Sequence, residues 1–177
     1  MDDDPRTSFA VRDAKPDEFD RLGQLMVAVY TSLDGFPSPE EQPNYYDMLA
    51  HIGLMVKKPG ARLLVAIAGE TLLGGIVYFA DMAQYGSGGT ATQEKAASGF
   101  RLLAVSPEAR GMGVGRTLAE ACITLAKESH HRQVIIHTTR AMQIAWTMYE
   151  GMGFRRSEDL DFMQGELPVF GFRLDLA

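Results

Sequence analysis

Three glycines, Gly111, Gly113 and Gly115, alternate in a short turn between an apolar, β-prone segment and an amphipathic helical pattern. The flanking segments predict a strand over 99–105 and a helix over 114–129. At such a junction the first amide N–H groups of the helix point outward, and the helix dipole favours an anion. Glycine also lets the main chain approach phosphate oxygens without a Cβ in the way. The turn therefore predicts an α/β domain that binds a phosphate or pyrophosphate.

Two well-known phosphate-binding loops do not fit this turn. A dinucleotide-binding fingerprint requires G-x-G-x-x-G, but after Gly111 and Gly113 the third required position is Arg116. A P-loop would need glycine at 110 and lysine at 116, and both positions are arginine. The remaining pattern is R-x-x-G-x-G, which begins at Arg110, and its arginines add positive charge to a chain whose formal net charge is −6.

The rest of the chain predicts a mixed sheet with helices on both faces. Segments 62–68 and 72–80 are apolar and are separated by Gly69-Glu70, which predicts an antiparallel hairpin. The strand, helix and strand of 99–138 predict a βαβ unit whose strands, 99–105 and 133–138, are parallel. The other predicted elements are strands 8–12, 153–157 and 169–176, a helix after Pro16, a helix from Asn44 to Lys58 and a helix over 141–150.

Size and composition set broad limits on the molecule. A chain of 177 residues predicts one domain over 1–177, with 1–7 as a flexible tail. The acidic surplus, 23 Asp and Glu against 17 Lys and Arg, disfavours a general nucleic-acid or anionic-membrane surface. The single cysteine, Cys122, and the absence of a signal peptide predict a cytoplasmic protein. No Cys/His cluster has metal-site spacing, so no metal is expected.

Two motifs together resemble those of the GNAT superfamily of N-acetyltransferases. Arg110 to Gly115, preceded by Leu103-Ala104-Val105, is similar to that family's coenzyme A loop, and 145–154 is similar to its A-x-x-x-Y-x-x-x-G-F segment. The resemblance covers 8–176 in element order and is specific over 99–155. It implies an α/β (α+β) fold with a mixed, mostly antiparallel sheet of about seven strands. It also implies that the parallel pair 99–105/133–138 splays apart.

The resemblance implies a cofactor site for acetyl-coenzyme A. The main chain of Leu103, Ala104 and Val105 would pair with the pantetheine arm as an added strand does. The loop residues would hold the pyrophosphate through backbone amides, with Arg116 nearby; they are Arg110, Gly111, Met112, Gly113, Val114 and Gly115. The family often has Asn where this chain has Met142, which removes one side-chain hydrogen bond to the arm.

Acetyl transfer to an amine needs a proton for the departing thiolate and a donor for the developing oxyanion. The resemblance places Tyr149 beside the sulfur, where a neutral phenol can protonate the thiolate, and implies the amide near Val105 as the oxyanion donor. The general base is less defined, because 98–101 offers no carboxylate on the strand where many relatives have Glu. His137, near the end of 133–138, is the candidate base, and a water-mediated or absent base is the alternative.

These features predict an N-acetyltransferase that transfers an acetyl group directly to a primary amine of a small molecule or protein. Tyr30, Tyr46 and Asp47 lie in the region that shapes the acceptor site in the family. The acidic surplus favours a cationic acceptor; it includes Asp47, Asp81, Asp159 and Asp161. The alternative is an acyl-coenzyme A sensor or interaction domain without turnover. A homodimer through 153–157 and 169–176 is also plausible.

Overall fold

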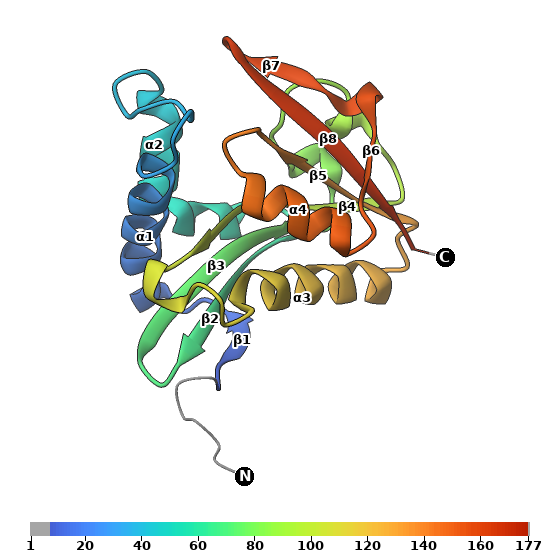
Figure 1. Cartoon of the computed structure of the whole chain (residues 1–177). Helices are drawn as coiled ribbons and strands as arrows, with labels where there is room; N and C mark the ends of the chain where they lie inside the picture. The colour runs from blue at the N-terminus through green and yellow to red at the C-terminus, as the bar shows by residue number, and fades with distance from the viewer. Residues whose placement is uncertain (1–7, 177) are drawn as a thin grey trace.

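The computed structural model describes residues 8–176, and the tail expected over 1–7 lies outside them. Its centre is an eight-stranded sheet in the order β1-β2-β3-β4-β5-β8-β6, with β7 paired to β8 (Figure 1). The strands are β1 (Ala10–Asp13), β2 (Ala61–Ala68), β3 (Thr71–Phe79), β4 (Ala97–Val105), β5 (Gln133–Thr138), β6 (Arg155–Arg156), β7 (Phe162–Gln164) and β8 (Leu167–Asp175). The mixed, mostly antiparallel sheet is confirmed, with one strand more than expected.

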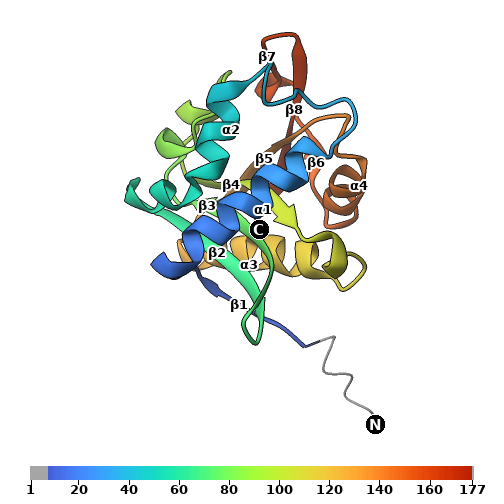
Figure 2. The same ribbon diagram turned by 90° about the vertical axis from the view of Figure 1, so that its left-hand side faces the viewer.

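Helices cover both faces of the sheet, and each face has its own apolar core. The helices are α1 (Phe19–Thr31), α2 (Pro43–Ala50), α3 (Val114–Glu128) and α4 (Gln143–Gly151). One core packs α1 and α2 on the sheet through residues such as Leu22 and Leu49. The other packs α3 and α4 through Leu118 and Tyr149. Figure 2 views the molecule with α1 and α2 toward the reader and α3 behind the sheet.

The only parallel strand pair of the described sheet, β4 and β5, is joined over a short length. Register pairs run from Ala97↔Gln133 to Gly99↔Ile135, and none follows toward the carboxyl ends of the strands. The expected splay is therefore confirmed. The two strands are connected by α3, so the mouth of the gap faces the glycine turn before that helix (Figure 1). The fold thus opens its sheet beside the predicted anion-binding loop.

Several boundaries differ from those predicted. The helix expected from Asn44 to Lys58 begins at Pro43, with Gln42 as its N-cap, and α2 ends at Ala50 before a 3₁₀ segment, Ile52–Lys57. Proline suits this first helical position because the N–H it lacks would have no intrahelical partner. The strand expected over 153–157 is reduced to two residues, and β7 was not predicted, because three residues carry no readable alternation.

None of the helices within 8–176 combines the length and the apolar character needed to cross a membrane.

Candidate active site

A β-bulge in β4 shapes the mouth of the gap. The register between β3 and β4 shifts between Gly75 and Val77, and Leu102 has a left-handed backbone with φ 63°. A side chain in this conformation is strained, so the surrounding sheet must hold it there. As a result, two successive side chains, Arg101 and Leu102, both face the core beneath α1 and α2. The bulge turns the strand's next residues toward the gap.

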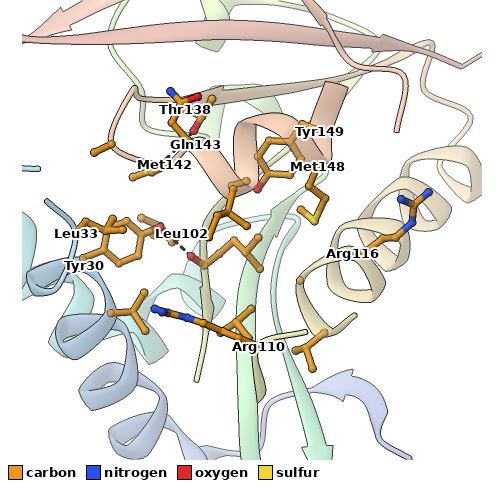
Figure 3. A pocket seen from close by; sticks show the side chains of 18 of the residues that line it. Tyr30, Leu33, Leu102, Arg110, Arg116, Thr138, Met142, Gln143, Met148 and Tyr149 are labelled. Atoms are coloured by element: carbon orange, nitrogen blue, oxygen red, sulfur yellow. Dashed lines mark hydrogen bonds between the residues drawn. The ribbon is translucent and has the colours of Figure 1, made fainter. Parts of the chain in front are cut away.

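Beyond the bulge, main-chain groups of β4 point into the gap. The Ser106 amide donates to the Leu73 carbonyl on β3 at 2.8 Å. Because backbone groups alternate in direction along a strand, those of Val105 and Leu103 face the opposite side, toward β5. The Leu103 carbonyl accepts a hydrogen bond from the Tyr30 hydroxyl at 3.1 Å, drawn as a dashed line in Figure 3. These are the main-chain groups that the sequence predicts to pair with an extended ligand.

The glycine turn presents a row of unused amides. Gly111 and Gly113 have left-handed backbones, with φ 82° and 80°, and a Cβ built on either would meet nothing within 4 Å. The first backbone bond of α3 runs from the Thr117 amide to the Gly113 carbonyl at 3.0 Å. Within the described chain, no backbone carbonyl accepts from the amides of Gly111, Gly113, Val114, Gly115 or Arg116. This open, glycine-lined helix N-terminus suits a pyrophosphate.

Other residues of the turn have more limited roles. The Met112 amide donates to the Ala109 carbonyl at 3.3 Å, so it closes the turn and does not face a ligand. The Arg110 side chain extends from the loop toward α1, whereas Arg116 lies on α3 and pairs with Glu120 at 3.0 Å (Figure 3). Arg110 and Arg116 both line the same cavity, and they give the end of it beside the glycine turn positive charge.

A single cavity of about 820 Å³ joins the glycine turn to the gap between β4 and β5. It is lined by the loop residues and by side chains of α1, β4, β5 and α4, among them Tyr30, Leu103, His137, Met148 and Tyr149. A second cavity of about 70 Å³ adjoins it. The residues shared by the two are Tyr30, Arg101, Leu102, His137, Thr138 and Met142. The site thus has a long chamber with a small side chamber.

Tyr149 lies in the wall of the large cavity, and its hydroxyl points into it (Figure 3). Its ring packs against Phe100 and Phe154, with centroids 5.7 and 5.8 Å away, on the α4 side of the sheet. Burial raises the pKa of the hydroxyl well above its ordinary value. The phenol therefore stays protonated at neutral pH and can act as a proton donor, but not as a base.

His137 lines both cavities, but its ring nitrogens are occupied. Nε2 lies 2.9 Å from the Leu160 carbonyl oxygen, which only accepts, so Nε2 carries the proton. Nδ1 then accepts from the Tyr85 hydroxyl at 2.9 Å. Burial lowers the pKa of His137 to about 4, and the Arg101 charge adds to this effect. The geometry leaves no free lone pair on the imidazole to accept a substrate proton.

The structure does not place the three residues expected at the acceptor site in one cavity wall. Tyr30 lines both cavities. Tyr46 lines neither; it is buried, and its hydroxyl donates to the Pro37 carbonyl at 2.6 Å, which anchors the segment before α2. Asp47 also lines neither, because it is on the exposed side of α2 beside His51. The structure therefore brings Tyr30 to the cavities but not Tyr46 or Asp47, and a role for these two residues in acceptor binding stays a prediction.

The structure also brings further residues to the small cavity. Tyr45, Phe36 and Phe162 form aromatic walls, and Arg101 and Thr139 supply polar groups. Tyr85, from the loop between β3 and β4, holds both His137 and Arg101. The sequence offered only one signal here, the length and composition of the loop over 81–97. None of the carboxylates thought to favour a cationic acceptor lines either cavity; they are Asp47, Asp81, Asp159 and Asp161.

Comparison with known proteins agrees with this geometry. The model of the Acetyltransferase (GNAT) family matches residues 26–154. N-acetyltransferase 8B of Mus musculus is 34% identical over 58 residues, 33% of this chain and 25% of that protein. N-acetyltransferase 8F1 of Rattus norvegicus is also 34% identical over 58 residues, 33% of this chain and 26% of that protein. The matched segment thus spans about a quarter of each curated relative.

Solved structures share the fold at low sequence identity. An acetyltransferase of the GNAT family from Staphylococcus aureus Mu50 has a TM-score of 0.74 at 16% identity, covering 96% of this chain and 100% of the other. The PaiA N-acetyltransferase from Thermoplasma acidophilum, in complex with coenzyme A, has a TM-score of 0.70 at 15% identity, covering 93% and 98%. The family match, which spans more than half of the sequence, shows that this chain belongs to the GNAT family of acetyltransferases.

Proposed function

We propose that this protein is an N-acetyltransferase that transfers an acetyl group from acetyl-coenzyme A directly to a primary amine. The observation that carries the proposal is the large cavity, in which the unused amides of the glycine turn and the Tyr149 hydroxyl face one continuous space. A pyrophosphate at one end and a thioester at the other would match the two ends of this chamber. Solved family members in complex with coenzyme A and with acetyl-coenzyme A support the choice of ligand.

The residues present fit this ligand at three places. At the turn, the space that a Cβ of Gly111 or Gly113 would occupy is open to phosphate oxygens. Along the gap, Leu103 and Val105 offer main-chain groups to an extended pantetheine arm. Beside the cavity, Tyr30 fixes the direction of the Leu103 carbonyl. When bound, acetyl-coenzyme A supplies an activated acyl group, and the protein supplies position and hydrogen bonds.

Two groups of the chain would act on the reacting atoms. The Val105 amide, which faces the gap, would donate to the oxygen on which negative charge develops. Tyr149 would donate its proton to the departing thiolate, a role that suits a buried phenol kept neutral. His137 would orient Tyr85 and the cavity wall instead of acting as the base, because both of its nitrogens are engaged. The acceptor amine would lose its proton to water.

The test is calorimetric titration with coenzyme A, followed by thiol release from acetyl-coenzyme A with a panel of primary amines. Binding with amine-dependent release is the expected result. Binding without release for any amine would favour an acyl-coenzyme A sensor. Absence of binding would contradict the proposal at its first step. A dimer through β8 and its neighbours is a separate expectation, which the sedimentation velocity of the same sample would check.

A further inference from the structure

Arg101 places a positive charge at the small cavity, and none of the described residues that line this cavity is a carboxylate. Its side chain lines both cavities. One nitrogen donates to the Tyr85 carbonyl at 2.9 Å, and the guanidinium lies over the Tyr85 ring, 5.6 Å from its centroid. Within residues 8–176, no Asp or Glu forms an ion pair with Arg101. A guanidinium has five N–H donors, so most of them are left for a ligand.

A second, independent polar group in the same chamber lacks a partner. The Thr139 hydroxyl is buried, and no described group forms a hydrogen bond with it. Thr139 lines the small cavity together with Arg101. A buried hydroxyl without a partner destabilises the folded state, so proteins rarely retain one. The small cavity therefore has an unpaired cation, and a residue of its wall, Thr139, carries an unsatisfied hydroxyl that is covered in this structure; together they favour a binding site for an anionic oxygen group.

The remaining walls of the small cavity are largely apolar. Tyr30, Phe36 and Tyr45 form a cluster with ring centroids 5.5 to 6.0 Å apart. Phe162 of β7 closes the other side against His137, with centroids 5.2 Å apart. His137 is neutral because its pKa is lowered, so Arg101 is the one charged side chain among the described residues that line this chamber. A ligand here should be apolar apart from its anionic group.

We infer that the acceptor is an α-amino acid with an apolar side chain, whose carboxylate binds Arg101 and the Thr139 hydroxyl. This inference rests on the proposed function and names the substrate class of its site. Arg101 lines the same continuous cavity as Val105 and Tyr149, so a carboxylate bound to Arg101 and the reacting amine would share one space. In the transfer, the C–S bond breaks, the amine nitrogen bonds the acetyl carbon, and the amine loses one proton while the thiolate gains one. An acceptor of this class carries a carboxylate, and it therefore differs from the cationic acceptor that the acidic composition of the chain favours.

Matched pairs of acceptors test this inference. Thiol release from acetyl-coenzyme A is measured with L-phenylalanine against phenethylamine, and with L-leucine against isoamylamine, which lack only the carboxylate. We expect kcat/KM to favour the acids by about 10- to 100-fold, the range for hydrogen bonds to a charged group. Arg101→Gln should remove this preference, and Arg101→Lys should retain part of it. Equal kcat/KM for acid and amine in the wild type would overturn the inference.

Two further measurements keep the inference separate from the proposed function. The first is calorimetry of N-acetyl-L-phenylalanine and N-acetylphenethylamine on the coenzyme A-loaded protein, which requires no turnover. Equal or absent binding of the two, with coenzyme A bound normally, would overturn the inference alone. Failure of coenzyme A itself to bind would overturn the proposed function and the inference together.

Thr139→Val gives the second measurement, because valine has the same shape without the hydroxyl. A ligand-binding hydroxyl predicts a KM for L-phenylalanine raised several-fold with an unchanged or higher melting temperature, since an unsatisfied buried group is removed. A lower melting temperature with an unchanged KM would overturn the assignment of Thr139 to the ligand. Arg101→Gln should leave the dissociation constant of coenzyme A unchanged, because the phosphates bind at the glycine turn.

Discussion

Tyr149 is the residue whose chemistry the site most depends on. Its hydroxyl faces the cavity, and its ring is fixed by Phe100 and Phe154. Tyr149→Phe keeps the ring and its packing, so the melting temperature and the dissociation constant of coenzyme A should change little. Loss of the proton donor should lower kcat about 100-fold, at the low end for general acid catalysis. Steady-state thiol release measures this change; equal kcat in both proteins would reduce Tyr149 to a packing role.

The pH dependence of turnover distinguishes a catalytic role of His137 from a structural one. A base with pKa about 4 is already deprotonated at neutral pH, so turnover rising between pH 7 and 9 should report deprotonation of the amine. We expect His137→Gln to keep that rise, with lower stability from loss of the bonds to Tyr85 and Leu160. A rise present in the wild type and absent in His137→Gln would assign the base to His137 after all.

The lowered pKa of His137 also predicts how the free energy of unfolding depends on pH. The folded protein holds the pKa of His137 at about 4, below the value of about 6.5 expected for the unfolded chain. Between these two values the unfolded state binds the additional proton, so lowering the pH favours unfolding. The free energy of unfolding should therefore fall from pH 6.5 to pH 4 more steeply in the wild type than in His137→Gln. Urea denaturation at several pH values measures the difference, and parallel curves would contradict it.

Coenzyme A binding can be tested by a substitution in the strand–turn–helix unit from β4 to α3. Gly113→Val puts a branched Cβ into space that is empty in the protein and is assigned to phosphate. Gly69→Val is the matched control, because Gly69 also has a positive φ, 60°, and open space, but lies in the hairpin between β2 and β3. Both variants should lose a similar free energy of unfolding, about 1–2 kcal/mol. Calorimetry should show loss of coenzyme A binding in Gly113→Val only; similar affinity in both would refute the assignment of the loop.

The same unit shows what the sequence could and could not predict. The glycine turn and the βαβ unit follow from local patterns, because turn conformation and helix periodicity are encoded within a few residues. Tyr149 was predicted through the resemblance of 145–154 to a family motif. The bulge at Leu102 does not follow from local patterns, since leucine has no preference for a left-handed backbone and the strain is held by the surrounding sheet. The roles proposed for Arg101 and Thr139 depend on this bulge and on contacts from distant segments. The positions of Tyr46 and Asp47 away from the cavities could not be predicted for a similar reason: which side of α2 faces the gap is set by tertiary packing.

At the scale of the whole molecule, the sheet consists of two parts with a weak join. β1 to β4 form one antiparallel part, and β5, β8 and β6 form the other. Among the described residues, strand pairing between the two parts is limited to the register pairs from Ala97↔Gln133 to Gly99↔Ile135. A ligand whose arm lies in the gap and whose phosphates bind the turn before α3 would contact both parts. We therefore expect bound coenzyme A to stabilise the fold by joining the two parts of the sheet.

Hydrogen exchange tests this prediction, with ADP as the comparison ligand because it has a pyrophosphate but no pantetheine arm. Both ligands should protect the amides of 113–116, whereas only coenzyme A should protect Val105, whose amide faces the gap. At a concentration about 100 times its dissociation constant, coenzyme A should add about 2.7 kcal/mol to the free energy of unfolding. Protection of Val105 by ADP as well would indicate general tightening of the fold. Protection by neither ligand would place the pantetheine arm outside the gap, because an arm that lies in the gap would shield this amide from water.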